Sequence, residues 1–170
     1  AALVDAESRM YLVDQPLGPS DRVMAGLSVA FDASCEEMWL AWRYGATLVA
    51  APRDIVRSAD ALGQWITDHR ISAVSTVPTL ASFWTTESLS NVRLLIFGGE
   101  ALPKELINRL ATPGREVWNT YGPTETTVIC SGELVQPLNA DEPVRIGRAT
   151  PGWQLAVINP DTEEPVRWGE

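Results

Sequence analysis

Short apolar runs alternate with segments of helical periodicity along most of the chain. The apolar runs predict strands, and segments such as that of Leu62, Trp65 and Ile66, whose apolar residues recur every three to four positions, predict helices. The expected strands cover residues 23–29, 47–51, 73–77, 92–97 and 116–118, and the expected helices cover residues 2–12, 37–44, 58–69, 78–84 and 103–110. Because strand and helix alternate about four times, we expect an α/β fold with a mostly parallel sheet flanked by helices.

Several residues mark where these elements begin and end. Ser34 is a candidate N-terminal cap for the helix that follows it, and Gly45 is placed to end that helix. Pro78 and Pro103 suit the first turn of a helix, where the missing backbone donor does no harm. The run VRLLIF at 92–97 is almost continuously apolar, which is typical of a strand buried on both faces.

The pattern changes after Tyr121. Residues 127–135 and 154–158 predict strands, and a loop rich in Pro, Asn, Asp and Gly separates them. We therefore expect residues 1–125 to form an α/β subdomain and residues 126–170 to form a strand-rich, truncated continuation. A length of 170 residues fits one domain or a large piece of one, with no complete second domain.

Composition narrows the possible functions. The 22 acidic residues outnumber the 13 basic ones, which gives a net charge of −9 and argues against a nucleic-acid-binding groove. The single histidine, His69, and the two cysteines, Cys35 and Cys130, form no zinc-binding or His-based catalytic pattern. So few cysteines favour a reducing cytoplasm. No signal peptide and no membrane-spanning apolar run is apparent, so no membrane partner is expected.

The candidate chemistry lies in three polar segments that follow predicted strands. They are FDAS at 31–34, GGE at 98–100 and NTYGPTE at 119–125. Ligands of open parallel sheets bind at the carboxyl ends of the strands, so all three segments should meet at one edge. Gly98 and Gly99 carry no side chain and would let a flat ligand approach the backbone, although a simple turn is the alternative interpretation.

NTYGPTE gathers groups that suit a nucleotide. An aromatic ring can stack on a base, an amide can hydrogen-bond to a base edge, and a hydroxyl can bind a phosphate oxygen. A carboxylate can hold Mg²⁺ against the phosphates. The chain has no GxxxxGK[ST] phosphate-binding loop, so this segment would bind the nucleotide in another way.

These segments resemble motifs of the adenylation domains of nonribosomal peptide synthetases, in the superfamily that also holds acyl-CoA synthetases and luciferases. NTYGPTE matches that family's NxYGPTE motif at every defined position, and FDAS matches its FDxS motif. Residues 96–101 match its GGE segment, which precedes a helix. The order and spacing also fit, and the resemblance covers essentially the whole chain.

The resemblance implies a two-step reaction that uses ATP and Mg²⁺. An amino-acid carboxylate attacks the α-phosphate of ATP, and the acyl group then passes to the phosphopantetheine thiol of a peptidyl carrier protein. Asn119 would bind the adenine amine and Tyr121 would stack on adenine. Thr124 would contact phosphate and Glu125 would coordinate Mg²⁺, and these two are the expected catalytic residues. The backbone around adenine and substrate would come from Gly98, Gly99 and Glu100.

The resemblance also implies a substrate pocket. Its expected lining residues are Asp32, Ala33, Glu36, Ser75, Ile96, Gly98, Thr120, Val128 and Ile129. Asp32 would pair with the substrate's α-ammonium, unless it caps the following helix instead. Glu36 is the exceptional charged position, and a desolvated carboxylate needs a cation. We therefore expect a cationic amino acid, namely lysine, β-lysine or ornithine, unless Glu36 faces solvent beside Glu37.

Two rival functions remain open at this point. One is a ligase of the same superfamily that activates an aryl or fatty acid, although such a substrate would leave Asp32 unpaired. The other is a non-catalytic binding fragment, because the family's TSGSTGxPKG-like loop, its YRTGD-like motif and its C-terminal catalytic Lys are not found here. Residues 166–170 resemble the stretch just before the family's GELxIxG motif. We therefore expect an internal core fragment, inactive alone, of an active adenylating enzyme.

Overall fold

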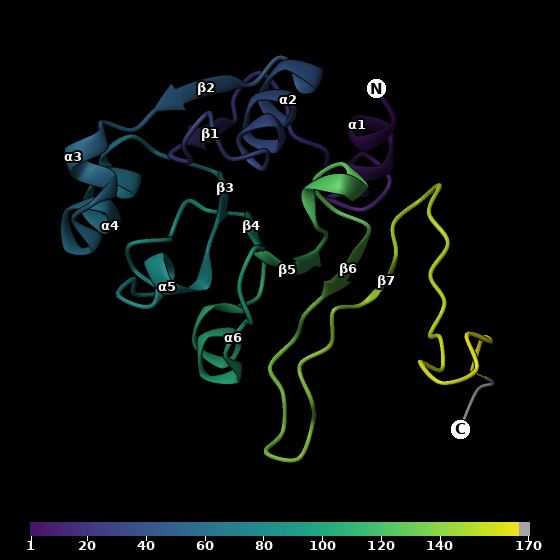
Figure 1. The fold of residues 1–170 in the computed structure, drawn as a ribbon. Coiled ribbons are helices and arrows are strands. Elements are labelled where there is room, and N and C mark those ends of the chain that lie inside the picture. Colours follow the sequence, from purple (N-terminus) through teal and green to yellow (C-terminus); the bar gives the residue numbers. More distant parts are fainter. Residues whose placement is uncertain (167–170) are drawn as a thin grey trace.

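The computed structural model describes residues 1–166 and shows one seven-stranded sheet with helices on both faces (Figure 1). The strands lie in the order β2-β1-β3-β4-β5-β6-β7. Their bounds are Arg22–Ala25 for β1, Thr47–Ala50 for β2, Ala73–Thr76 for β3, Leu94–Phe97 for β4, Glu116–Tyr121 for β5, Ser131–Leu134 for β6 and Arg148–Ala149 for β7. The helices are α1 (Ala2–Glu7), α2 (Ser34–Tyr44), α3 (Arg53–Val56), α4 (Ala59–Asp68), α5 (Pro78–Ala81) and α6 (Lys104–Leu110), with a short 3₁₀ helix η1 at Thr124–Thr126.

The strands from β2 to β5 are parallel, as the alternation of strand and helix predicted. The apolar β4 is the central strand of the seven-stranded sheet, and its residues are fully buried. Ser75 on β3 lies opposite Ile96 on β4, and Phe97 on β4 lies opposite Asn119 on β5. This register brings the carboxyl ends of β3, β4 and β5 to one edge of the sheet.

Two apolar clusters hold the helices against the two faces of the sheet. On one face, α4, α5 and α6 pack their apolar residues against β4, where Leu95 and Phe97 point toward them. On the other face, α1, α2 and the turn after α1 cover Leu94 and Ile96. Alternate residues of β4 therefore belong to different clusters, which is the period-two pattern of a strand buried on both sides.

The C-terminal part adds β6 and β7 antiparallel to the edge of the sheet beyond β5. A long loop joins β6 to β7 and extends away from the sheet (Figure 1). The strand expected at 154–158 was wrong: this segment forms an isolated bridge between Ile158 and Pro165 instead. An exposed segment gains little from alternating polarity, because it has no sheet edge to pair with. Residues 167–170 of the expected continuation lie outside the described residues.

Several element boundaries differ from the sequence-based expectation. The first helix ends at Glu7 and continues as turns, and Arg53–Val56 forms an unpredicted short helix. Ser34 is the first residue of α2 rather than its cap, and Ala33 occupies the cap position with no side-chain hydrogen bond. Gly45 ends α2 in the left-handed conformation, as expected (φ 66°). Within the described part of the chain, no helix is long and apolar enough to cross a membrane.

Candidate active site

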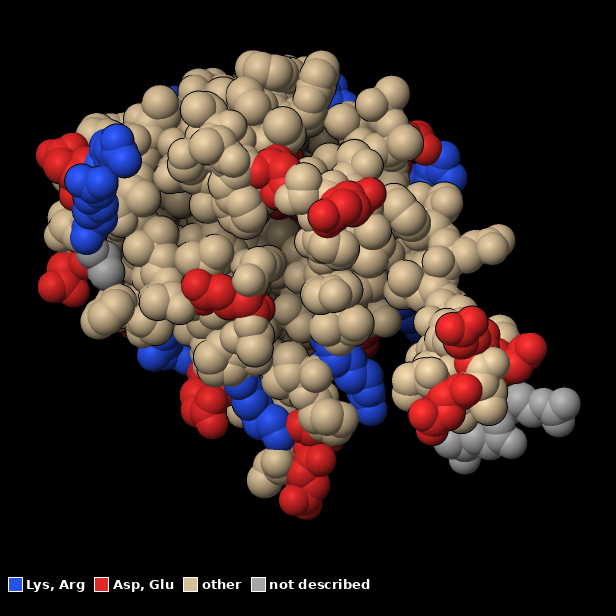
Figure 2. Space-filling model, viewed as in Figure 1, with Lys and Arg blue, Asp and Glu red and all other residues tan. Residues whose placement is uncertain are grey.

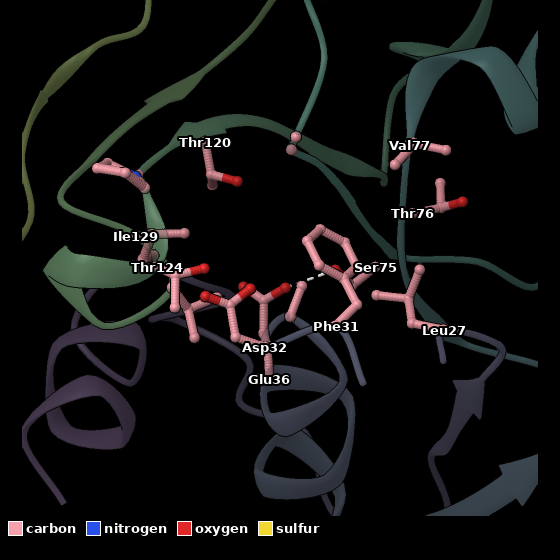
Figure 3. A pocket seen from close by; sticks show the side chains of 16 residues that line it. Leu27, Phe31, Asp32, Glu36, Ser75, Thr76, Val77, Thr120, Thr124 and Ile129 are labelled. Carbon is pink, nitrogen blue, oxygen red and sulfur yellow. Dashed lines mark hydrogen bonds between the residues drawn. The ribbon is translucent and has the colours of Figure 1, made fainter. Parts of the chain in front are cut away.

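The loops that follow β1, β3, β4 and β5 surround a cavity of about 260 Å³ at the carboxyl edge of the sheet. The cavity is hollowed into the surface, and acidic rather than basic side chains border it (Figure 2). No Lys or Arg of residues 1–166 lines it. Its lining comprises Leu27, Phe31, Asp32, Ala33, Glu36, Ser75, Thr76, Val77, Gly98, Gly99, Thr120, Gly122, Pro123, Thr124, Val128 and Ile129 (Figure 3).

Glycine backbone shapes the wall of this cavity. A Cβ built on Gly98 would lie 2.9 Å from Thr120 Oγ1, whose hydroxyl donates a hydrogen bond to the carbonyl of Phe97 at 3.0 Å. A Cβ on Gly122 would lie 2.5 Å from Ile129 Cα. Only glycine permits the chain to fold back on itself this closely. The site therefore depends on glycine at two strand ends.

The return of the chain at Ile129 requires unusual backbone conformations. Thr127 and Val128 both adopt left-handed φ values, 62° and 71°. This region is unfavourable for a β-branched residue, and such strain is concentrated at functional sites. The two residues turn the chain after η1, so that Val128 and Ile129 face the cavity.

Asp32 presents an unpaired carboxylate to the cavity. It lies in the loop between β1 and α2, and its Oδ2 atom is buried with no hydrogen-bond partner. Asp32 does not cap α2, because Ala33 holds the cap position. A buried carboxylate oxygen without a donor is costly, which makes this atom a binding group for a cation or a donor of the substrate.

Glu36 is buried on the first turn of α2 and is only 2% exposed. Its Oε1 accepts a hydrogen bond from the Tyr11 hydroxyl at 3.1 Å, and its Oε2 accepts one from the Ser75 hydroxyl at 2.5 Å. Figure 3 shows Glu36 beside Asp32, with both carboxyl groups directed into the same space. The solvent-facing alternative for Glu36 was therefore wrong. Burial raises the pKa of Glu36, and the hydrogen bonds from Ser75 and Tyr11 oppose that rise.

The second carboxyl group behind Glu36 belongs to Glu7, the last residue of α1, which is also 2% exposed. Burial raises the pKa of Glu7 to about 10, and the charge of Glu36 and hydrogen bonding between the two carboxyl groups add to this rise. Two carboxylates in one buried space cannot both be ionised at low cost. Burial and the neighbouring charge therefore favour the protonated form of Glu7.

Four of the nucleotide-binding residues expected from the sequence, Gly99, Glu100, Asn119 and Tyr121, lie around an adjoining cavity of about 460 Å³. Gly99, Thr120, Gly122 and Pro123 line both cavities, so the two spaces share a wall. Tyr121 is 51% exposed and offers its ring to this second cavity. The remaining lining residues are Glu100, Ala101, Leu102, Asn119, Val144 and Ile146.

Asn119 is held in place by the loop between β6 and β7. Its Nδ2 donates a hydrogen bond to the carbonyl of Arg145 at 2.7 Å. That bond uses the donor side of the amide and leaves Oδ1 as an acceptor. An amide oxygen at this position suits a donor such as the exocyclic amine of adenine.

The comparisons with known proteins agree with this geometry. The sequence model of the family described as AMP-binding enzyme matches residues 1–170. The chain belongs to the family of AMP-binding enzymes. Within the family it corresponds to a segment of a nonribosomal peptide synthetase adenylation domain, as the motifs predicted.

Two curated relatives and one solved structure illustrate the similarity. The chain is 43% identical over 143 residues to the delta-poly-L-ornithine synthetase of Acinetobacter baumannii, which covers 84% of the chain and 10% of that protein. It is 35% identical over 156 residues to the phosphinothricin tripeptide synthetase PhsC of Streptomyces viridochromogenes, covering 89% of the chain and 13% of the relative. The Vibrio cholerae adenylation domain AlmE, solved with glycyl-adenosine-5′-phosphate, aligns with a TM-score of 0.77 and 25% identity over 94% of this chain and 30% of AlmE.

The structure of this AMP-binding enzyme brings most of the expected substrate positions to one cavity. The exception is Ile96, which is fully buried on β4 two residues before Gly98 and packs beneath the cavity rather than at its surface. Of the expected nucleotide residues, Gly99, Glu100, Asn119 and Tyr121 line the second cavity, whereas Gly98 and Thr124 line the first.

The carboxylates of Glu100 and Glu125 have different surroundings. Glu100 accepts hydrogen bonds from the backbone N–H and the hydroxyl of Thr79, at 3.0 and 2.5 Å, so it ties the loop after β4 to α5. Glu125 lies exposed in η1, next to Thr124. Within residues 1–166 no cluster of three or more metal-ligating side chains exists. Mg²⁺ often takes one carboxylate together with substrate phosphates, so the single free carboxylate of Glu125 fits that ion.

Sequence reasoning missed three residues at or beside the substrate site. Glu7 ends α1 and Tyr11 lies four residues further on, in the turn after the helix, and both side chains reach Glu36. No motif marks them, and their spacing of four residues is the only sequence signal. Thr76, whose buried Oγ1 has no partner, was missed as well, although it directly follows the predicted Ser75.

Proposed function

We propose that the protein containing residues 1–170 activates a cationic amino acid, namely lysine, β-lysine or ornithine. The substrate carboxylate attacks the α-phosphorus of ATP, the bond to the β-phosphate oxygen breaks, and aminoacyl adenylate and pyrophosphate result. The acyl group then passes to the phosphopantetheine thiol of a peptidyl carrier protein. The observation that carries this proposal is the pairing of Asp32 with Glu36 in one cavity.

The two carboxylates match the two ammonium groups of a diamino acid. The unpaired Oδ2 of Asp32 is available to the α-ammonium, and the buried Glu36 is available to the side-chain ammonium. A neutral side chain would leave the charge of Glu36 buried without a cation, which costs several kcal/mol. The absence of any Lys or Arg from the cavity lining in residues 1–166 means that no protein cation competes for either carboxylate.

Similarity to known proteins supports the same substrate class. The relative in Acinetobacter baumannii is named for ornithine, and the chain shares 43% identity with it over 143 residues. An aryl or fatty acid is less compatible, because it has no ammonium for Asp32. A role as a non-catalytic binding fragment gives no reason for two adjoining cavities, one acidic and one with an exposed aromatic ring.

For the nucleotide, the chain supplies groups that bind and orient. Tyr121 stacks on adenine, and the free acceptor oxygen of Asn119 receives the adenine amine. The hydroxyl of Thr124 contacts the α-phosphate beside the substrate carboxylate. Glu125 would hold Mg²⁺, which would neutralise phosphate charge when bound.

The carrier protein and the compartment belong to the same proposal. Nonribosomal peptide synthetases among the relatives support a carrier-protein partner. Cys35 and Cys130 are free thiols in the structure, which fits a reducing cytoplasm.

The proposal is tested by ATP–pyrophosphate exchange with the complete protein that contains residues 1–170. The amino-acid panel includes ornithine, lysine, β-lysine, neutral residues and acidic residues. We expect exchange with the cationic members and a strong loss of this preference in Glu36→Gln. A preference for neutral amino acids that Glu36→Gln leaves unchanged would overturn the proposal.

A further inference from the structure

Glu7 lies directly behind the substrate cavity without lining it. It is the last residue of α1, and its Oε1 atom is buried with no hydrogen-bond partner. The carbonyl of Glu7 accepts the backbone N–H of Tyr11 at 2.9 Å, and the Tyr11 hydroxyl in turn donates to Glu36. The end of α1 and the turn that follows it thus deliver two groups, a carboxyl and a phenol, to the same buried carboxyl of α2.

The side chains that surround Glu7 and Glu36 are acidic or neutral on each element that packs against the two carboxyl groups. Tyr11 comes from the turn after α1, Glu37 comes from α2, Ser75 comes from β3, and Asp32 comes from the loop before α2. The nearby basic side chains make their contacts at the protein surface. Arg9 forms an ion pair with Asp5, and Arg43 donates a hydrogen bond to Ser8 at 3.0 Å. In the described structure no cation offsets a second negative charge next to Glu36.

We propose that Glu7 is a positioning residue for substrate selection: as a neutral carboxylic acid it donates its proton to Glu36 and keeps the Glu36 carboxylate ionised and aimed into the cavity. This inference rests on the proposed function, because it explains how Glu36 stays ready for a side-chain ammonium. Glu7 itself does not touch the substrate.

The distribution of donors decides which member of the pair keeps the proton. Glu36 already accepts from Tyr11 and Ser75, whereas Glu7 Oε1 has no donor. Burial raises the pKa of Glu36, and the hydrogen bonds from Ser75, Tyr11 and Glu7 oppose that rise, whereas burial and the charge of Glu36 both raise the pKa of Glu7, to about 10. The pair therefore carries one negative charge, which matches one ammonium, rather than two, which the buried site could not hold.

Two substitutions separate this role from simple packing. Glu7→Gln retains a donor to Glu36 and a similar volume, whereas Glu7→Met fills the space without a donor. In the complete protein we expect Glu7→Gln to keep the preference of kcat/KM for ornithine over its neutral isostere norleucine. We expect Glu7→Met to reduce that preference about tenfold, because one hydrogen bond to a charged group is lost. Glu105→Gln, at an exposed position of α6, is the matched control.

The pH profile of kcat/KM for ornithine supplies a readout that packing alone would not move. In Glu7→Met the acid limb, which reports ionisation of Glu36, should shift to higher pH, and in Glu7→Gln it should stay near that of the unmodified protein. Infrared spectra should show a protonated carboxyl band at pH 8 that disappears in Glu7→Gln. Thermal unfolding of each variant establishes that it is folded.

The outcomes are distinguishable from a failure of the proposed function. An unshifted acid limb in a folded Glu7→Met variant, with Glu36→Gln still abolishing the ornithine preference, would overturn the role of Glu7 and leave the function standing. The absence of a protonated carboxyl at pH 8 would overturn it as well. If Glu36→Gln changes no preference, the proposed function itself fails.

Discussion

Glu36 and Glu37 are neighbours on α2 and are both buried, yet their carboxyl groups bind different partners. Glu36 faces the substrate cavity, where Tyr11 and Ser75 donate to it. Glu37 accepts the backbone N–H groups of Gly26 at 2.9 Å and Leu27 at 3.2 Å, and so ties the loop after β1 to α2. One carboxyl thus belongs to the ligand site and the other to the scaffold that positions the loop.

Glu37 should make stability depend on pH. Burial raises the pKa of Glu37 from 4.5 to about 7, despite the two backbone hydrogen bonds and with a contribution from the charge of Glu36. The folded state therefore binds this proton more tightly than the unfolded chain does. The stabilisation is complete below the unfolded pKa of 4.5 and is lost as the pH rises through about 7.

Glu37→Gln should reduce that dependence, because an amide keeps an acceptor oxygen but does not titrate. Between pH 4 and pH 8 the free energy of unfolding should decrease in both proteins. The decrease should be about 3 kcal/mol smaller in Glu37→Gln than in the unmodified protein. Some dependence of the free energy of unfolding on pH should remain in Glu37→Gln, because the pKa of Glu7 is raised as well. Thermal unfolding at several pH values measures the effect, with exposed Glu105→Gln as the control. An unchanged pH dependence in Glu37→Gln would contradict this role.

Asp32→Asn should lower kcat/KM for every amino-acid substrate. The substitution removes the charge that meets the α-ammonium, and the loss of a charge-assisted hydrogen bond in a buried site costs about 2–3 kcal/mol, or roughly a hundredfold. Asp54→Asn, at an exposed position of α3, should have no effect. Pyrophosphate-exchange kinetics measure both variants. Equal activity of Asp32→Asn and the unmodified protein would show that the α-ammonium binds elsewhere.

Tyr121→Ala should raise the KM for ATP about tenfold, because stacking of a base on an aromatic ring contributes about 1–3 kcal/mol. Tyr121→Phe keeps the ring and should keep the KM near its original value. ATP titrations at saturating amino acid measure the change. If both variants bind ATP equally, the exposed ring of Tyr121 does not stack on adenine.

Gly122→Ala should disturb the fold at the site. The new methyl group would lie 2.5 Å from Ile129 Cα and 2.6 Å from the carbonyl oxygen of Val128, both backbone atoms that cannot move aside cheaply. Overpacking of this kind costs about 1–3 kcal/mol. Gly18→Ala is the matched control, since nothing lies within 4 Å of its added Cβ. A melting temperature unchanged in Gly122→Ala would contradict the tight approach.

The parallel sheet could be predicted from the sequence because its strands are short apolar runs, and because residues such as Gly45, Pro78 and Pro103 mark where the neighbouring helices begin or end. The central run 92–97 and the stop at Gly45 are examples in which local chemistry and tertiary structure agree. The expected strand at 154–158 failed, because strand formation depends on a partner edge that the segment does not find. Local alternation of polar and apolar residues carries no information about that partner.

The substrate cavity was predicted only where a motif or a strand end marked it. Asp32, Gly98 and Thr120 follow strands, so the topology alone brings them to one edge. Glu7 and Tyr11 reach the site through the packing of α1 against α2, which no local pattern encodes. The burial of Glu36 was likewise a question of three-dimensional packing, and the sequence left it open.

The central claim is that Glu36 selects a side-chain ammonium. The most direct test is the ratio of kcat/KM for ornithine to kcat/KM for norleucine, which replaces the ammonium with a methyl group of similar size. We predict a ratio well above one for the complete protein and a fall of about a hundredfold or more in Glu36→Gln, because a buried ion pair broken on one side costs about 3–5 kcal/mol. A ratio near one in the unmodified protein, or the same ratio in Glu36→Gln, would contradict the account.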